Sequence, residues 1–175
     1  DGLADALAEA KTRLDEGDID IAREIYLQIL AQEQDHPSAL AGVMRCYMAH
    51  GEPAKARNFL AKVPAEIARH AEIVSVRTAL ELAAQAPVGS AVKTLTQRLA
   101  ANPDDHQTRH DLAMAYYANG DHPSAVEELL EIVRRDRAWN EDAARKQLVR
   151  LFEAFGPTDP LPLAGRRRLS SLLFS

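Results

Sequence analysis

Apolar side chains recur along the chain at steps of three and four residues and do not alternate singly with polar ones. Steps of three and four place side chains on one face of a helix, whereas single alternation is typical of a half-buried strand. The pattern is clear near the end of the chain, at Leu148, Leu151, Phe152 and Phe155. The sequence therefore predicts an all-α fold without strands.

Proline and aspartate indicate where several helices begin. Proline suits the first helical turn, which needs no amide donor there, and aspartate accepts hydrogen bonds from free amides. Asp35 and Asp121 are the candidate capping residues. Starts are predicted at His36-Pro37, Glu52-Pro53, Val63-Pro64 and His122-Pro123. Longer helices are predicted from about Ile67 to Ala84, from Asn140 or Glu141 to Phe155, and from Asp159-Pro160 onward.

The chain repeats itself at nearly constant spacing. The anchors of the repeat are Gly17, Gly51, Ala86 and Gly120. Each anchor is followed five residues later by alanine: Ala22, Ala56, Ala91 and Ala125. The position seven residues before each anchor is also small in three of four cases: Ala10, Met44, Ala79 and Ala113. Glycine turns the chain between two helices, and alanine lets two helices approach closely.

This arrangement resembles the tetratricopeptide repeat (TPR), a helix–turn–helix unit of about 34 residues. The fourth unit carries the resemblance best, at Leu112, Ala113, Tyr116, Gly120, Ala125 and Leu129. The resemblance implies a TPR-type right-handed superhelix of antiparallel helix pairs, with about four repeats at residues 3–36, 37–66, 67–104 and 105–138. Residues 139–175 would form a C-terminal capping helix pair, which a stack of repeats needs at its end.

Composition agrees with closely packed helices and excludes several classes of protein. Hydrophobic residues make up 46% of the chain, with alanine the most frequent of them, whereas aromatic residues make up only 5%. The single cysteine, Cys46, excludes an intrachain disulfide framework and a multi-thiolate metal site. The sequence shows neither an apolar run long enough to span a membrane nor the features of a signal peptide.

Charge is unevenly distributed along the chain. The net charge is −5, but residues 134–175 carry nine Lys/Arg and five Asp/Glu, a net of +4. Such a basic run is usually a solvated helix face, and the alternative is docking on an acidic partner. The overall acidic balance argues against binding of nucleic acid.

Two segments at the end of the chain resemble a more specific family. Residues Ala144–Gly156 (ARKQLVRLFEAFG) and Gly165–Phe174 (GRRRLSSLLF) are similar to the carboxy-terminal end of the chaperedoxins. These bacterial co-chaperones combine a thioredoxin-like domain with a TPR domain. The resemblance implies a thioredoxin-like domain before Asp1, a cytoplasmic location, and binding of unfolding or oxidised client proteins for transfer to the chaperonin or the Hsp70 machinery.

The family's redox residues are absent from this chain, so we expect no enzymatic activity and no cofactor. Two alternatives stay open. In the first, the chain is a generic TPR scaffold of a regulatory or secretion complex. In the second, it is an accessory domain of a thiol-disulfide oxidoreductase. No nucleic-acid or membrane partner is expected.

The TPR resemblance places a protein-binding groove on the first helix of each repeat. Its candidate residues are Lys11, Arg45, Met48, Val76, Leu80, His110, Met114 and Tyr117. A mainly apolar groove with methionines suits adaptable binding of varied peptides, with Lys11 and Arg45 as anchors. The alternative is that Ile73, Val76 and Leu80 are core residues covered by the cap.

The last predicted helix is a second candidate surface. Its basic and apolar residues are Arg166, Arg167, Arg168, Leu172, Leu173 and Phe174. If its apolar side packs on Leu148, Leu151 and Phe155, the helix is only a cap. If Leu173 and Phe174 are exposed, it is a helix that docks in the groove of a partner.

Other reactive residues give weak signals. His106 and His110 share one helix face, but two histidines do not complete a zinc site, and surface histidines are the favoured interpretation. Cys46 is interpreted as a small buried hydrophobe rather than a reactive thiol. The sequence predicts no catalytic residue and no metal site.

Overall fold

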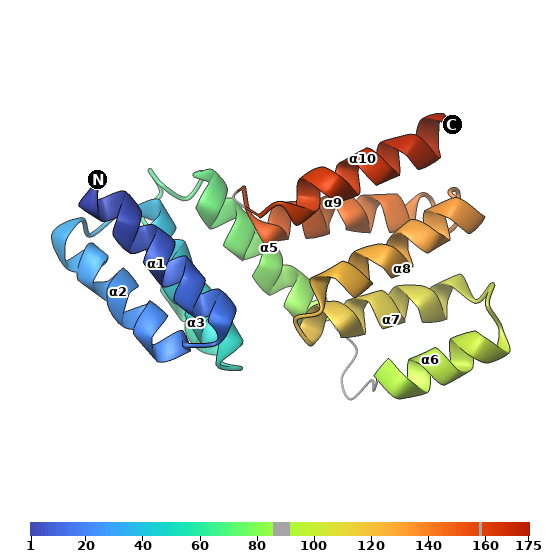
Figure 1. Cartoon of the computed structure of the whole chain (residues 1–175), viewed down its shortest axis with the longest axis horizontal. Coiled ribbons are helices and arrows are strands. Elements are labelled where there is room, and N and C mark those ends of the chain that lie inside the picture. Colours follow the sequence, from blue (N-terminus) through green and yellow to red (C-terminus); the bar gives the residue numbers. More distant parts are fainter. Residues whose placement is uncertain (86–91, 158) are drawn as a thin grey trace. The chain divides into compact units, whose positions relative to one another are not determined.

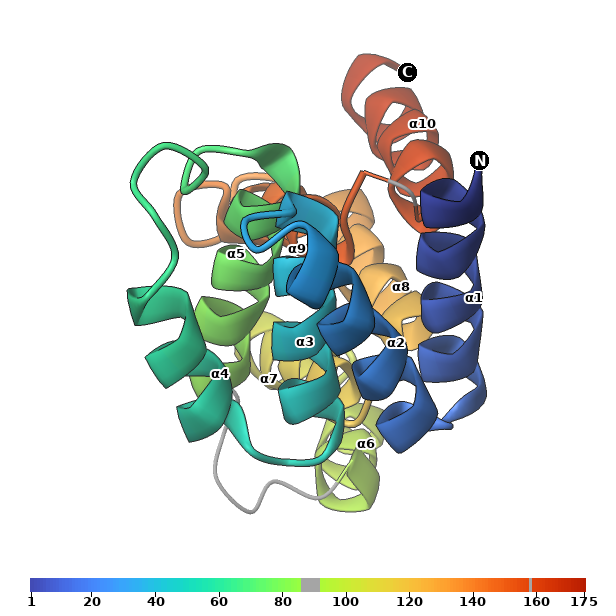
Figure 2. The same cartoon turned by 90° about the vertical axis from the view of Figure 1, so that its left-hand side faces the viewer.

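The computed structural model describes residues 1–85, 92–157 and 159–175, and its helices are shown in Figures 1 and 2. Within these ranges every regular element is a helix, which confirms the predicted all-α fold. Two positions of the repeat, Ala86 and Ala91, lie outside the described residues. The chain divides into two compact units, residues 1–80 and 81–175, with the boundary inside one helix.

Unit 1 consists of helices that pair in sequence order. Figure 2 shows α1 beside α2 and α4 beside α3, and α2 also packs against α3. The unit includes α1 (Gly2–Glu16), α2 (Ile19–Gln32), α3 (Pro37–Ala49), α4 (Pro53–Ala61) and the first part of α5 (Ala71–Gln85).

Unit 2 is built around the α7–α8 pair. In Figure 1, α6 lies along α7, and α9 and α10 lie on the other side of α8. The unit contains the end of α5, α6 (Val92–Ala101), α7 (His106–Ala118), α8 (His122–Arg135), α9 (Ala143–Phe155) and α10 (Leu161–Phe174).

The small repeat residues lie where helices cross. Ala10, Ala22, Ala56, Ala113 and Ala125 are completely buried. At these positions alanine lets the helix axes come close together. The three described anchors have the positive φ angles that glycine adopts cheaply, at Gly17 (90°), Gly51 (74°) and Gly120 (81°).

A glycine inside α3 serves packing rather than turning. A Cβ atom on Gly42 would lie 2.4 Å from the ring of Tyr26, which is only 5% exposed. The glycine therefore costs helix propensity but lets the α2 ring lie directly on the α3 backbone.

One of the two predicted capping residues is confirmed, and the other is not. Asp121 caps α8 by accepting a hydrogen bond from the Ser124 amide, as predicted. At α3, however, the cap is Nδ1 of His36, which accepts from the Ala39 amide, rather than Asp35.

Pro64 begins a turn instead of a helix, and α5 begins at Ala71 rather than near Ile67. The reason is local, since Nδ1 of His70 accepts a hydrogen bond from the Glu72 amide and so starts a new helix. The Ala68 carbonyl is in turn taken by the guanidinium of Arg77.

The start of α9 also differs from the prediction. Instead of beginning at Asn140 or Glu141, the helix begins at Ala143, after three consecutive residues with left-handed backbone. Asn140, Glu141 and Asp142 have φ angles of 48°, 56° and 63°. Single left-handed residues outside glycine are uncommon, so a run of three is a costly local conformation.

Candidate functional site

The predicted groove residues of unit 1 differ in accessibility. Lys11 is exposed on α1, and its ammonium lies 2.8 Å from the Asp15 carboxylate. Arg45 of α3 donates a hydrogen bond of 2.7 Å to the Ser75 hydroxyl, and Met48 is half-buried one turn further along α3. These three side chains are the part of the predicted groove within reach of solvent in unit 1.

Val76 and Leu80 lie in the core of unit 1 instead. They are 0% and 3% exposed and pack with Ile73, Leu40 and Met44. Aliphatic side chains buried among other helices of the same unit are not available to the side chains of a partner. Within unit 1 their buried neighbours come from α3 and α4.

The predicted groove residues of unit 2 also point largely inward. Met114 is 3% exposed, and its sulfur accepts a hydrogen bond of 3.1 Å from the Gln147 amide. The Tyr117 ring stacks on His122 with centroids 5.1 Å apart. His110 is half-buried, and burial lowers its pKa while the neighbouring Asp111 opposes the shift.

The three arginines at the start of α10 have different environments. Arg168 forms a bidentate ion pair with Glu127 of α8, and the guanidinium of Arg166 lies 5.6 Å from the centre of the Phe152 ring. Arg167 is exposed and forms no ion pair with the described residues. Of the three, only Arg167 therefore offers a guanidinium that is not already engaged within unit 2.

The apolar residues of α10 also divide between two sides. Leu169 is buried, and Leu172 and Leu173 are half-buried against unit 2. Phe174, by contrast, is 86% exposed and Leu163 is 57% exposed. Steps of four and seven residues place Leu163, Arg167 and Phe174 on one helical stripe, which we call the outer face of α10.

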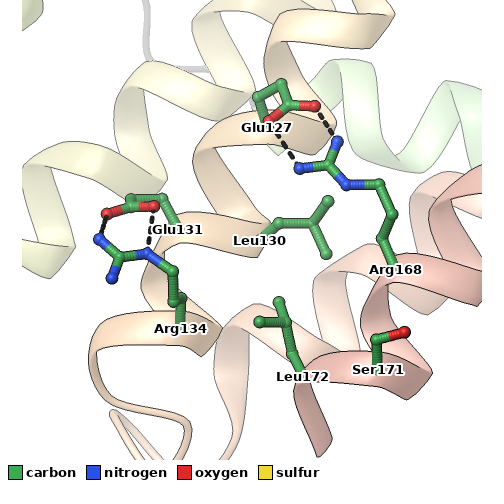
Figure 3. A pocket seen from close by; sticks show the side chains of 7 residues that line it. All are labelled: Glu127, Leu130, Glu131, Arg134, Arg168, Ser171 and Leu172. Carbon is green, nitrogen blue, oxygen red and sulfur yellow. Dashed lines mark hydrogen bonds and ion pairs between the residues drawn. The ribbon is translucent and has the colours of Figure 1, made fainter.

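A shallow cleft separates α8 from α10 (Figure 3). Its sides carry two ion pairs, Glu127 with Arg168 and Glu131 with Arg134, and Leu130 and Leu172 lie between them. Hydrogen bonds from Arg134 and Arg135 lower the pKa of Glu131 to about 2. All charges in the cleft are thus already paired, so a bound segment would have to displace one of these pairs.

Two features of unit 2 were not predicted from the sequence. Arg109 is almost buried between α7 and α8, where it donates 2.9 Å hydrogen bonds to Glu128 and to the Pro103 carbonyl. Trp139 lies against the two histidines of α7, with ring centroids 6.0 Å from His106 and 5.9 Å from His110. The paired histidines and the only tryptophan could have drawn attention to this region, but nothing in the sequence predicts that Trp139 contacts the two histidines.

The reactive residues have settings that suit structural roles. Cys46 is fully buried, and burial raises the pKa of its thiol to about 11, which leaves it protonated at neutral pH. In the part of the chain that the structure describes, no cluster of three metal-ligating side chains forms around His106 and His110. Among the same residues, no helix has the length and apolar character needed to cross a membrane.

Comparison with known proteins relates both units to the same repeat. Models of the tetratricopeptide repeat match residues 13–80 and residues 85–174. A solved domain of unknown function from Vibrio parahaemolyticus is 25% identical, with a TM-score of 0.47, over 97% of this chain and 98% of that one.

Curated relatives come from bacteria. An uncharacterized protein of Mycobacterium tuberculosis is 27% identical over 169 residues, which are 97% of this chain and 44% of that protein. Cellulose synthase 1 operon protein C of Komagataeibacter xylinus is 34% identical over 107 residues, 60% of this chain and 8% of that protein. The chain thus spans less than half the length of these relatives. Because the match at residues 85–174 alone covers more than half of the chain, the protein belongs to the tetratricopeptide repeat family.

Proposed function

We propose that the chain is the protein-binding domain of a thioredoxin-like co-chaperone of the cytoplasm. TPR repeats suggest a protein–protein interaction scaffold, and proteins built from them are generally not enzymes. The resemblance of Ala144–Gly156 and Gly165–Phe174 to the chaperedoxins supports the narrower assignment. The domain would then hold unfolding or oxidised clients and pass them to the chaperonin or to the Hsp70 machinery.

The outer face of α10 is the observation that carries this proposal. Phe174 is 86% exposed at the end of the helix, and Arg167 of the same stripe is not engaged in an ion pair with the described residues. A large exposed ring on the same helical stripe as a cation favours docking into an apolar groove with an acidic rim. We assign this role to α10 as the contact with a chaperone machine.

The solvent-accessible part of the predicted groove would bind the client. Lys11, Arg45 and Met48 combine two cations with a flexible apolar side chain, which suits peptides of varied sequence. We also propose that this domain consists of the four repeats and the capping helix pair at residues 139–175.

A binding assay with matched variants tests the role of α10. We expect the 175-residue chain to capture bacterial chaperonin and the variant Arg167→Ser/Phe174→Ser to lose at least about tenfold in affinity, as for a hot-spot pair. Ser170→Ala, on the same exposed side of α10, is the control and should bind normally. Equal capture by both variants would contradict docking through α10.

An aggregation assay tests the client function separately. We expect the chain at stoichiometric amounts to slow the aggregation of a heat-unfolded or oxidised enzyme. Lys11→Ala/Met48→Ala should weaken this effect, whereas Arg167→Ser/Phe174→Ser should not. Aggregation at an unchanged rate in the presence of the chain would exclude a holding function.

A second candidate is a scaffold of a secretion or synthesis assembly. The similarity of 60% of the chain to cellulose synthase 1 operon protein C supports it. If the chain is such a scaffold, it should bind the subunits of one particular assembly and should not protect unfolded enzymes from aggregation. The aggregation assay therefore distinguishes the scaffold from the co-chaperone domain.

A further inference from the structure

The connection between α8 and α9, residues 136–142, has an unusual backbone for its sequence. Three consecutive residues, Asn140, Glu141 and Asp142, have left-handed φ angles, and none of them is glycine. Backbone of this kind persists only where the surroundings hold it in place. We call residues 136–142 the Trp139 linker.

Trp139 packs on one face of α7. Its ring centroid lies 6.0 Å from that of His106, edge to face, and 5.9 Å from that of His110. The two histidines are four residues apart, so they stand one above the other beneath the same indole. Nδ1 of His106 is buried and finds no hydrogen-bond partner among the described residues. The linker is thus held by a contact that depends on two titratable rings.

The same linker also holds the last turn of α10. Arg137 donates a hydrogen bond of 3.1 Å from Nη1 to the carbonyl of Leu173. The residue after Leu173 is the exposed Phe174, and only Pro162, Gly165 and Leu169 of α10 are buried. A displacement of the linker would therefore break this hydrogen bond and free the last turn of α10, where few apolar contacts hold the helix in place.

We propose that the Trp139 linker is a proton-sensitive brace that holds the end of α10 while His106 and His110 are neutral and releases it when they are protonated. Two positive charges one helical turn apart repel each other, and burial beneath the indole disfavours the charged form of His110. Both effects favour departure of Trp139, and with it of Arg137. The biological consequence, control of the docking helix by pH, rests on the proposed function.

Two carboxylates of α7 favour the protonated histidines and so act against this effect. Burial lowers the pKa of His110 more than Asp111, on the same helix, raises it. Asp105 precedes His106 on α7 and attracts its positive charge, while the same carboxylate accepts hydrogen bonds from the amide and hydroxyl of Thr108.

The elements packed on α7 carry further charged groups. No ion pair joins any of them to either histidine within the described ranges. They are Arg98 of α6, Glu128 and Arg135 of α8, and Asp136, Arg137, Glu141 and Asp142 of the linker.

One favourable interaction opposes the proposal and makes it testable. A protonated histidine is attracted to the face of an indole, which would tighten the contact in acid. The ring planes of His106 and Trp139 are inclined by 66°, an edge-to-face arrangement. The two mechanisms predict opposite signs for the movement of Trp139 and of α10.

The experiment uses the intact chain and two readouts between pH 8 and pH 5. Trp139 is the only tryptophan, so its fluorescence reports on the linker directly. Amide hydrogen exchange, corrected for the intrinsic effect of pH, reports on the last turn of α10. We expect the emission to shift to longer wavelength and the exchange at Leu172–Phe174 to rise severalfold as the end of α10 opens more often.

Two variants identify the groups responsible. In His106→Gln/His110→Gln both responses should disappear, and a remaining response would point to His122, stacked on Phe155 with centroids 4.7 Å apart, and overturn the proposal. In Arg137→Gln the emission should still respond, while exchange in α10 should be high at every pH.

Unchanged or slower exchange in acid in the wild-type chain would overturn the brace. So would an Arg137→Gln variant whose α10 still responds as in the wild type. If circular dichroism shows that the double histidine variant does not fold, the wild type and Arg137→Gln decide alone. Since neither readout needs a partner, failure of the proposed function leaves this result unaffected.

Discussion

Helices α8 and α10 both have 14 residues and lie side by side in unit 2, yet they are held in different ways. The buried residues of α8 are Ala125, Val126, Leu129, Leu130, Ile132 and Val133. Those of α10 are only Pro162, Gly165 and Leu169. Besides the half-buried Leu172 and Leu173, α10 is attached by one ion pair, one arginine–ring contact and one hydrogen bond from the linker.

The difference shows that two helices of one unit can differ in the free energy needed to detach them, with α8 firmly packed and α10 weakly attached. Burial of an aliphatic side chain contributes about 1.5–3 kcal/mol, whereas an exposed ion pair contributes about 0–1 kcal/mol. Opening of α10 alone therefore requires far less free energy than opening of α8. A helix of this kind can exchange its contacts within the unit for contacts with a partner.

The largest expected effect comes from truncating the core of α8. Leu129 is completely buried, so Leu129→Ala should lower the free energy of unfolding of unit 2 by about 3 kcal/mol. Leu172→Ala, on the half-buried side of α10, should cost less than about 1 kcal/mol. Urea denaturation followed by circular dichroism measures both values. Similar costs would mean that α10 is as firmly packed as α8.

Gly165→Ala tests the close contact between α10 and α9. Alanine improves helix propensity by about 1 kcal/mol, but its Cβ would lie 2.5 Å from the ring of Phe152, which is only 2% exposed. Because the buried ring cannot swing away, we expect a net loss of about 1–2 kcal/mol. Hydrogen exchange in α10 should rise while that in α8 stays the same.

Gly2→Ala is the matched control for this substitution. The added Cβ meets no atom within 4 Å there, so stability should stay the same or increase. A stabilised Gly165→Ala variant would show that α10 does not rest on Phe152 in solution.

The sequence predicts these helices well because the relevant forces are local. The steps of three and four residues, the glycine turns and the Asp121 cap act within one or two helical turns. The exceptions at Pro64 and His36 arise because a histidine ring supplied a cap that the usual preferences assign to aspartate.

The candidate site was less predictable because it depends on contacts between distant residues. Arg168 and Glu127 are 41 residues apart, and no local rule singles out Arg167 as the one of the three arginines that forms no ion pair with the described residues. Repeat positions likewise identified Val76 and Met114 as groove residues, yet burial depends on which neighbouring helix covers them.

The left-handed linker offers a test with a smaller effect. Glycine tolerates the φ of 56° at Glu141, so Glu141→Gly should stabilise unit 2 by about 1 kcal/mol. Lys146→Gly, at an exposed position inside α9, should instead cost about 1 kcal/mol. Chemical denaturation of both variants measures the difference. Destabilisation by both would mean that the backbone at Glu141 is not strained.

The smallest effect concerns the ion pair that joins the two helices. A hydrogen bond from Arg168 lowers the pKa of Glu127, so the carboxylate stabilises the fold above its ordinary pKa of 4.5. This contribution is lost as the pH falls below that value through the lower pKa of the folded state. Glu127→Gln should therefore cost about 0.5 kcal/mol at pH 7 and nothing once the carboxylate is protonated in the folded protein.

A double-mutant cycle with Arg168→Gln isolates this pair from other losses. We expect a coupling of about 0.5 kcal/mol that shrinks at high salt, because both side chains are more than half exposed. Exchange in α10 should increase in each single variant, with no further increase in the double variant. A coupling as large as the cost of Leu129→Ala would remove the contrast between the two helices, since α10 would then be fixed by charge as firmly as α8 is by burial.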